Sequence, residues 1–483
     1  MSRFNNLRAQ FTSPSPVENR SGTALPRPRI LPPAPPPSAA KPASTPRFDP
    51  IWVADENNAL RKLGFWFALG FVFIRLSMFH EILTFGMGIN LFLPYVLGIP
   101  AILLVLTSGG VVRTFRAKPA ILLAAFMVWL LLVSPFSSWK GGTVELLTDS
   151  FKTEFSMLFM VAGLVMTWRE LQWVASCIAL CAGINVLAAM KYGVTWGEGA
   201  RFSLTFGTLQ NPNDMATHML LVAPFALLVL LNLRGLNLKS LACVAALIGT
   251  LIIVVKTGSR SALLTIVVMV IFIFVKARGG QRLLIAGSTM LACFLTVVVA
   301  PDMLYKRFLS IVEFTPDMMD SDEMAGALGS SEARKSLLKQ SLWATLKHPI
   351  TGVGPGQFAT YEADVAKIAG RRSGWQVTHN SYTEVSSEAG IPAFLFFTGS
   401  ILSSLFLLNR IYRRAFEDPS FLPIRNFAFC LMLSMTGFAS SIFFASMAYR
   451  YYLSVLVGLT VSFAVFAHTH MNAHKHSAVK QTA

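Results

Sequence analysis

Long uninterrupted apolar runs recur along the chain from about residue 64 to residue 467. A run of about 20 such residues is long enough to cross the hydrocarbon core of a bilayer as an α-helix. The alternating pattern of a transmembrane β-barrel is missing from the sequence. The chain is therefore predicted to be all-α, a polytopic transmembrane helical bundle of about twelve spans, at residues 63–80, 85–106, 118–135, 153–168, 170–190, 213–231, 240–256, 260–276, 282–300, 384–407, 424–445 and 448–467.

The segments outside these runs divide the chain further. Residues 1–55 are rich in proline, alanine and serine, cannot build a core, and are predicted to form a disordered cytoplasmic tail, either passive or recruiting a partner. Nine spans fill residues 60–300 and three fill 384–467, and residues 468–483 form a second cytoplasmic tail.

Residues 301–383, between the ninth and tenth predicted spans, exceed the usual length of a structureless loop. Within them, SSEARKSLLKQSLWATLKHP predicts an amphipathic helix, with a serine N-cap and a proline stop. The glycine-rich GVGPGQF that follows lacks the Lys-Ser/Thr pair of a phosphate-binding P-loop. The loop is therefore expected to have helical structure of its own.

The net charge is +17, and the positions of the basic residues along the chain indicate the membrane topology. If the N-terminus is cytoplasmic, every substantial inside loop is basic, as the positive-inside rule requires. The basic residues are then explained by membrane topology, and nucleic-acid binding is not indicated. Residues 301–383 face outward, where ATP and nucleotide-sugars, which are cytoplasmic, cannot serve as donors. The inside cations are Arg113, Arg116, Lys118, Arg234, Lys239, Lys276, Arg278, Arg282, Arg410, Arg413, Arg414 and Arg425.

The five cysteines indicate neither a disulfide framework nor a metal site. All of them lie inside apolar runs, where a thiol behaves as a small hydrophobic group. They are Cys177, Cys181, Cys243, Cys293 and Cys430.

Three outward-facing positions hold nitrogen bases or cations near the membrane surface: Arg201, Arg260 and His379. Arg260 stands in a Gly-Ser-Arg-Ser turn at the head of a span, where a desolvated guanidinium favours an anionic partner. The planar fork of arginine suits phosphate oxygens, so the set suggests a site for a lipid-linked diphosphate. Taken singly, each arginine is explained better by snorkelling to the interface.

His379 is a candidate general base for an acceptor hydroxyl, because a neutral imidazole accepts protons near pH 7. Asn380 adjoins it, and Glu384 and Glu388 follow within about two helical turns, where they can orient it or tune its basicity. The alternative is a hydrogen-bonded interfacial histidine.

The segment NPND, with Asn211, Asn213 and Asp214, has both a functional and a plain interpretation. It stands before an apolar run, where a turn and an N-cap are expected. His218, one turn beyond Asp214, is predicted to be a buried, hydrogen-bonded histidine.

Together these segments resemble the O-antigen ligase family, whose membrane domain is shared with O-antigen polymerases and some protein O-oligosaccharyltransferases. The matching features are Arg201 ahead of Asn-Pro-Asn, SRSALL with Arg260, HPITGVGPGQF and HNSYTEVSSEAGIPA. In the last motif His379, Asn380 and Gly390 fit the ligase pattern, whereas Ala393 replaces its final Gly, Thr or Tyr, which favours a sister activity. The resemblance covers about residues 60–467.

The resemblance implies a GT-C-like glycosyltransferase of the bacterial inner membrane, with its active site facing the periplasm. The donor would be a glycan on undecaprenyl diphosphate, held by Arg201 and Arg260 at the diphosphate. His379 would take the proton from an acceptor hydroxyl, on lipid A-core, on another glycan or on a protein. The transfer would invert the anomeric carbon and require neither a metal nor a cofactor.

Two groups of alternatives remain open. Within the family, the protein is an O-antigen or exopolysaccharide polymerase, or an enzyme that loads glycan onto protein serines. Outside the family, it is a polysaccharide flippase or transporter, which also has about twelve spans. Transporters typically show intramembrane charges and internal repeats, whereas the sequence shows few mid-span charges and no obvious duplication.

Overall fold

The computed structural model describes residues 56–196, 201–283, 285–287, 290, 322–370 and 375–482, and these form a helical membrane bundle. Most of the predicted ninth span, residues 282–300, and all of the N-terminal tail, residues 1–55, lie outside the described residues. Seven described helices are long and apolar enough to span a bilayer, and a bent pair, Ala59–Leu76 with Phe79–Gly86, makes an eighth if it is one span. The seven are Lys118–Phe136, Trp168–Tyr192, Pro212–Asn232, Leu238–Lys256, Ser381–Arg414, Pro419–Ser441 and Tyr451–His474.

The predicted all-α class is confirmed, with one small hairpin added. The strands are β1 (Gly193–Trp196) and β2 (Arg201–Leu204), paired antiparallel with Trp196 opposite Arg201. The α-helices are α2 (Ala59–Leu76), α3 (Phe79–Glu81), α4 (Leu93–Thr107), α5 (Gly110–Thr114), α6 (Lys118–Val133), α7 (Lys140–Asp149), α8 (Ser156–Leu164), α9 (Trp168–Tyr192), α10 (Pro212–Asn232), α11 (Leu238–Lys256), α12 (Arg260–Lys276), α15 (Asp322–Lys347), α16 (Phe358–Ile368), α17 (Ser381–Arg414), α18 (Leu422–Ser441) and α19 (Tyr451–Thr482).

Two predicted spans are irregular. The run at 85–106 becomes a π-helical turn, Ile82–Gly86, followed by α4, which contains Pro94 and Pro100. The short run at 153–168 becomes a second π-helical turn, Ser150–Phe155, and the nine-residue α8. Proline removes a helical hydrogen bond, which explains the irregularity near α4. The π-helical turns are a second source of irregularity, and such turns are frequent at functional sites.

The core lies where the long helices pack together: α17 against α6, α10 among α9, α11 and α18, and α19 against α8. Phe126 on α6 and Phe397 on α17 are fully buried, with ring centroids 5.5 Å apart. Leu103, Leu132 and Leu402 are more than half exposed, although they lie in apolar helices. Such residues face outward as expected of a lipid-facing surface.

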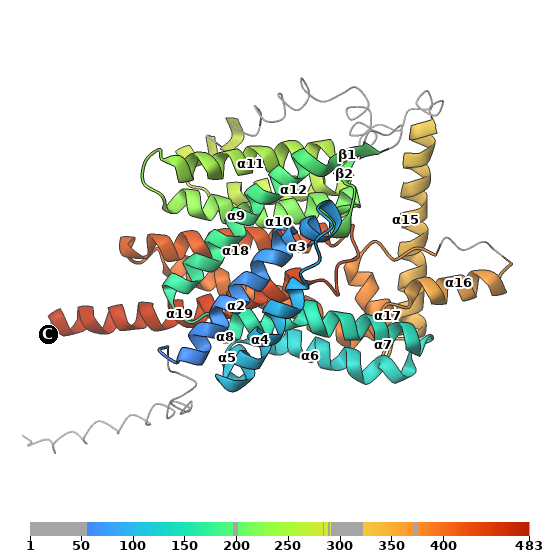
Figure 1. Cartoon of the computed structure of the whole chain (residues 1–483), viewed down its shortest axis with the longest axis horizontal. Coiled ribbons are helices and arrows are strands. Elements are labelled where there is room, and N and C mark those ends of the chain that lie inside the picture. The colour runs from blue at the N-terminus through green and yellow to red at the C-terminus, as the bar shows by residue number, and fades with distance from the viewer. Residues whose placement is uncertain are drawn as a thin grey trace, which may run out of the picture. The chain divides into compact units, whose positions relative to one another are not determined.

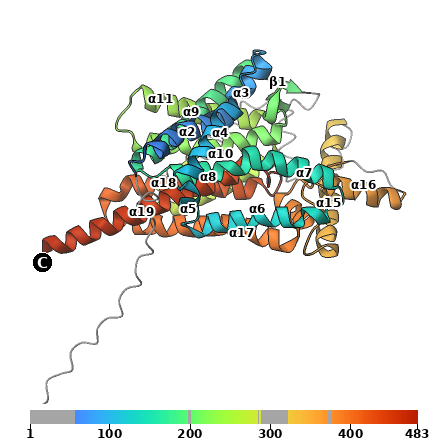
Figure 2. The same cartoon turned by 60° about the horizontal axis from the view of Figure 1, so that its bottom comes forward.

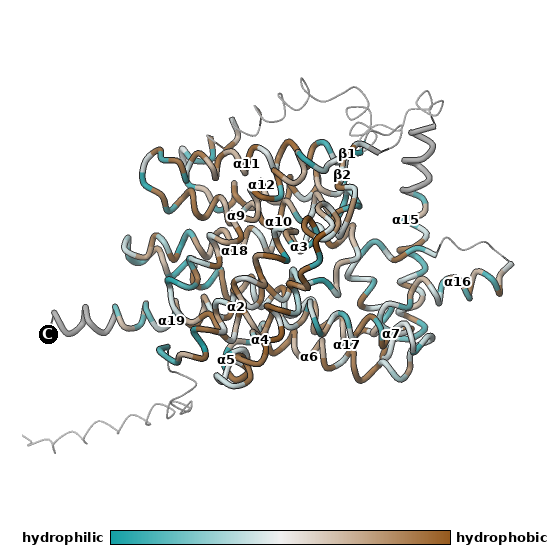
Figure 3. Tube along the Cα trace, viewed as in Figure 1, coloured by the Kyte–Doolittle hydropathy of each residue, from teal (hydrophilic) through white to brown (hydrophobic). Residues whose placement is uncertain are grey.

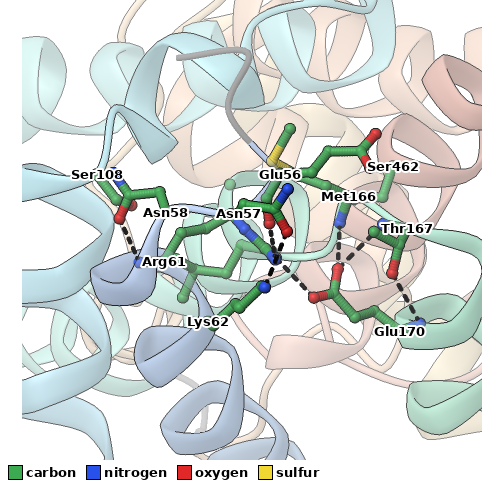
Figure 4. A network of polar contacts seen from close by, with 12 residues as sticks. Glu56, Asn57, Asn58, Arg61, Lys62, Ser108, Met166, Thr167, Glu170 and Ser462 are labelled. Atoms are coloured by element: carbon green, nitrogen blue, oxygen red, sulfur yellow. Dashed lines mark hydrogen bonds and ion pairs between the residues drawn. The ribbon is translucent and has the colours of Figure 1, made fainter. Parts of the chain in front are cut away.

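A buried ion pair fixes the first helix to its neighbours (Figure 4). The Arg61 guanidinium donates to the Glu170 carboxylate and to the Leu164 carbonyl, both at 2.7 Å. Glu170 also accepts from the backbone of Met166 and Thr167, in the capping box that begins α9. Because both charges are satisfied, the pair can be buried.

Helices α7, α15 and α16 lie together at one end of the bundle (Figures 1 and 2). Hydrophilic residues recur along α15, whereas the bundle helices are mainly hydrophobic (Figure 3). The predicted amphipathic helix is thus present as α15, but its predicted start at Ser330 is wrong, since the helix begins at Asp322. It ends at Lys347, shortly before Pro349, as the proline predicts.

Candidate functional site

His379 stands two residues before α17, directly ahead of the helix N-cap. Its backbone is left-handed, with φ at 52°. The next residue, Asn380, is the N-cap of α17, and its side chain accepts from the backbone of Tyr382 and Thr383. Ser381 is bonded to the loop after α18: its amide donates to the Ile442 carbonyl and its hydroxyl to the Ala445 carbonyl. These contacts hold the half-buried imidazole at the head of the span.

Arg201, the NPND segment and the turn before α12 form one polar network. The Arg201 guanidinium donates to the Thr257 carbonyl at 3.2 Å and to the Asn213 side-chain oxygen at 2.8 Å. The same oxygen accepts from the Ser259 hydroxyl at 2.8 Å. Ser259 is the N-cap of α12, so Arg260 is the first residue of that helix. The two arginines therefore stand on elements joined by Asn213.

Arg334, on α15, connects this network to His379. Burial, and then the neighbouring Arg260, lower the pKa of Arg334. Burial, and then Arg334, lower the pKa of His379 from its usual 6.5. Since a nearby cation disfavours protonation, the imidazole is neutral at pH 7. Arg334 thus lies within electrostatic range of both Arg260 and His379, although the three residues come from separate helices or their ends.

The glycine-rich loop binds a carboxylate of the chain itself. Glu388 on α17 accepts from the Gly356 amide at 2.7 Å and from the Phe358 amide at 3.2 Å. It also accepts from the Tyr449 hydroxyl at 2.7 Å, and burial followed by this carboxylate raises the pKa of Tyr449 well above its usual range. Amides of such turns often bind anions, and here they donate to the Glu388 carboxyl group of the chain itself.

Glu384 is likewise turned toward the loop after α18, where it accepts from the Ala448 amide at 3.3 Å. The described hydrogen bonds of Glu384 and Glu388 thus go to loops that surround α17, and none of them is to His379. Both carboxylates are buried. Their observed contacts stabilise the backbone around the site.

Beside these residues lies a cavity of about 640 Å³, called here the acidic cavity. Its walls come from α7, the glycine-rich loop, the start of α10, the start of α17 and the loop after α18. Its lining includes six carboxylic residues and one arginine, Arg450. The carboxylic residues are Glu145, Asp149, Glu154, Asp214, Glu384 and Glu388.

The structure therefore brings the motif residues together in two groups. Arg201, Asn213 and the Arg260 turn form the cationic side, with Arg334 leading to His379. Glu384, Glu388 and Asp214 line the acidic cavity. Asn211 and Asn380 serve as helix N-caps.

His218 is buried, as predicted, and its ring nitrogens lie 2.9 Å from the Tyr452 hydroxyl and 2.9 Å from the Asn185 amide.

Sequence reasoning did not identify Arg334 and Arg450. Arg334 occurs in the helix that the sequence predicts, where it reads as one of several basic residues of an amphipathic surface. Arg450 precedes the last span and reads as an interfacial anchor. The sequence signal that could have identified Arg334 is its position in the predicted amphipathic helix, because such a helix packed on a membrane domain points some of its basic residues inward.

Residues 244–398 match the family model described as O-Antigen ligase. The matched segment includes Arg260, Arg334 and His379, whereas Arg201 lies before it. No curated protein matches the chain.

Proposed function

This chain is a membrane protein of the O-antigen ligase family by its match over residues 244–398, and on that premise we propose a specific reaction for it. The protein transfers a glycan from undecaprenyl diphosphate to an acceptor hydroxyl, on the periplasmic face of the bacterial inner membrane. We propose the lipid A-core as the acceptor, in keeping with the match to the O-antigen ligase model. Arg201, Arg260 and Arg334 bind the donor diphosphate, and His379 is the general base.

The observation that carries the proposal is a chain of cations that ends at the imidazole. Arg201 and the turn of Arg260 are joined through Asn213, Arg334 lies within electrostatic range of Arg260, and His379 lies within range of Arg334. Arg260 and Arg334 lie close enough to lower the pKa of Arg334, which is a repulsive arrangement. Like charges at a poorly solvated site are stabilised when an anion lies between them. A lipid-linked diphosphate supplies that anion and reaches the site from the bilayer.

The proposed chemistry is a single displacement. The acceptor oxygen attacks the anomeric carbon as His379 takes its proton, and the bond between that carbon and the diphosphate oxygen breaks. The electron pair leaves on the diphosphate, where the guanidinium groups stabilise the growing negative charge. Attack opposite the leaving group inverts the anomeric configuration. The arginines supply the positive charge that a metal ion provides in other phosphate chemistry, so the proposed step uses no metal.

The decisive variant is His379→Ala. Loss of a positioned base lowers the rate of transfer by about 10²–10⁴-fold. Binding of undecaprenyl diphosphate remains normal, because the arginines hold the diphosphate. The measurements are transfer per folded molecule in native membranes, and binding of radiolabelled undecaprenyl diphosphate to the purified chain.

The matched control is His348→Ala. His348 also lies in the outer segment, where its ring contacts Tyr361 at a centroid distance of 5.6 Å. This variant retains transfer. Near-normal specific activity of His379→Ala would remove the histidine from the mechanism. Transfer that elongates lipid-linked glycan and leaves lipid A-core unmodified would identify a polymerase instead of a ligase.

A further inference from the structure

We infer that the acidic cavity is the acceptor site, and that it takes a sugar chain whose terminal residues carry neither phosphate nor carboxylate. The inference rests on the proposed function, since it names the substrate class for the acceptor half of that reaction.

The size and walls of the cavity suit a short glycan. Its volume of about 640 Å³ falls in the roughly 300–1,000 Å³ range of ligand pockets. Trp139, at its edge, is 56% exposed and offers an indole face on which a sugar ring can stack. Carboxylate oxygens along the walls accept hydrogen bonds from hydroxyl groups. The lining thus provides both an aromatic surface and many acceptors.

Two chain connections place the cavity beside the reacting groups. Asp214 lines the cavity, while its neighbour Asn213 accepts from Arg201. Val377 also lines the cavity, two residues before His379. Thr378 stands between Val377 and His379 in the sequence, and its hydroxyl is 3.2 Å from the hydroxyl of Ser446, another lining residue. A glycan in the cavity therefore lies next to both the base and the cationic side.

Charge decides which glycan fits. The six carboxylic residues outnumber Arg450, the arginine of the lining, although Glu154 also has Arg75 at 2.6 Å and Asp149 has Lys152 at 3.8 Å. A phosphate or carboxylate on the acceptor would meet the exposed carboxylates of Glu145 and Asp149, and this repulsion of like charges lowers its affinity without any steric block. The donor diphosphate belongs on the arginine side for the same reason. The two halves of the site thus sort the substrates by charge.

The test is direct binding of two probes to the full chain in detergent, loaded with undecaprenyl diphosphate. The probes are maltotriose, a neutral trisaccharide, and its phosphate monoester, and saturation-transfer NMR measures both. Maltotriose binds more tightly than the phosphate ester, by threefold or more. Equal binding of the two, or no saccharide binding, would overturn the inference.

Glu145→Lys with Asp149→Lys tests the charge argument. Both residues are exposed on α7, so the replacement leaves the core intact. The double variant reverses the preference, so that the phosphate ester binds more tightly than maltotriose. The matched control, Asp364→Lys, changes an exposed acid of α16 that does not line the cavity, and it keeps the original preference. An unchanged preference in the double variant, or the same shift in the control, would also overturn the inference.

A second variant tests the site without altering charge. A methyl group at Gly142 would lie 2.6 Å from the Trp139 ring and 2.8 Å from the Gln357 amide nitrogen, so Gly142→Ala displaces the cavity wall. It weakens maltotriose binding and leaves undecaprenyl diphosphate binding unchanged. These saccharide measurements report binding and do not require glycan transfer. The proposed reaction is tested separately, since it would be refuted if His379→Ala did not lower the rate of transfer.

Discussion

The left-handed backbone of His379 is unusual for a residue with a Cβ, and the conformation has a cost that its surroundings must offset. The Thr378 hydroxyl donates to the Asn380 carbonyl, and the Asn380 side chain caps α17. Ser381 is bonded to the loop that begins at Ile442. Hydrogen bonds of Thr378, Asn380 and Ser381 therefore fix the backbone on both sides of His379. This agrees with a catalytic role that requires the imidazole to be held in one position.

The pH dependence of transfer follows from the lowered pKa of His379. A base is active only when it is unprotonated, so the rate falls as the pH drops through that pKa. Because burial and Arg334 both lower it, the fall comes at a pH below 6.5, the value of a free imidazole. Arg334→Gln removes one cation, which raises the pKa and moves the acid limb to higher pH. The measurement is kcat/KM of both proteins against pH, and an acid limb that stays in place would contradict the assigned neighbour.

Arg201 and Arg260 are expected to differ from lysine at the same positions. Arg201→Ala or Arg260→Ala weakens undecaprenyl diphosphate binding by about tenfold, the effect of one charge-assisted contact. Lysine restores only part of the affinity, because it lacks the planar fork. Arg425→Ala, at the expected cytoplasmic side, serves as the control and binds normally. Full activity of the double alanine variant at limiting donor would exclude both residues from the site.

Among the elements, α17 is the one that the site depends on most. Its helical path breaks at Gly390, where φ is 81° and ψ is 176°. A Cβ at Gly390 would collide with the Ile350 carbonyl. Past the break, the Ile391 amide donates to the Pro349 carbonyl at 2.8 Å. The glycine therefore allows the loop after α15 to contact the backbone of a membrane helix.

Gly390→Ala is expected to destabilise the protein by about 2–4 kcal/mol, through a strained φ together with overpacking. The matched control is Gly183→Ala on α9, where a Cβ would meet no atom within 4 Å. The control keeps or slightly raises stability, since alanine favours helices. The apparent melting temperature in detergent distinguishes the two. Equal melting temperatures would show that the close contact at Gly390 is dispensable.

Element positions were largely predictable, because apolar runs determine membrane helices directly. The break at KTGSR was predicted, with one span ending at residue 256 and the next beginning at residue 260, and α11 and α12 end and begin at these residues. The break in α17 was not predicted, because a glycine followed by Pro392 is tolerated in a membrane helix and reads as continuous. The start of α15 was also missed, since serine at residue 330 is compatible with both an N-cap and a helix interior.

At the scale of the whole molecule, the ends of distant helices meet. Arg414, at the end of α17, donates to the Asn472 side chain of α19, and Lys276 of α12 donates to the Asn409 side chain, both at 2.6 Å. Three of the cations that the charge pattern assigns to the cytoplasm, Lys276, Arg410 and Arg414, thus belong to neighbouring helix ends. These cations therefore share one side of the bundle, as the charge pattern requires.

Sidedness is tested with single cysteines. Ser336→Cys lies on an exposed position of α15, and Leu236→Cys lies in the loop between α10 and α11, where Leu236 is 92% exposed. A membrane-impermeant maleimide labels the first in intact spheroplasts and the second only after lysis, relative to the parent chain. The reverse pattern would place the candidate site in the cytoplasm and exclude the proposed donor.

The two halves of the site were unequally predictable. His379, Arg201 and Arg260 stand in recognisable motifs, so the sequence identified them without a structure. The acidic cavity has walls from five segments that are far apart in the chain, and Glu145 looks like an ordinary surface acid when it is taken alone. Only tertiary packing reveals such a site, since no local pattern records which segments meet.

The contacts between the loop after α15 and the broken part of α17 also determine how the protein can be recombined with its relatives. The Val353 and Gly354 amides donate to the Ser387 and Glu388 carbonyls, both at 2.9 Å, and the Thr345 hydroxyl lies 2.9 Å from that of Ser386. A chimera that joined two parents between these partners would pair loops and helices that had not evolved together. Crossovers before Thr345 or after Ile391 keep these pairs intact. Ser381 and Glu388 also bond to the loop after α18, so an exchange of specificity needs residues 345–391 together with that loop from one parent.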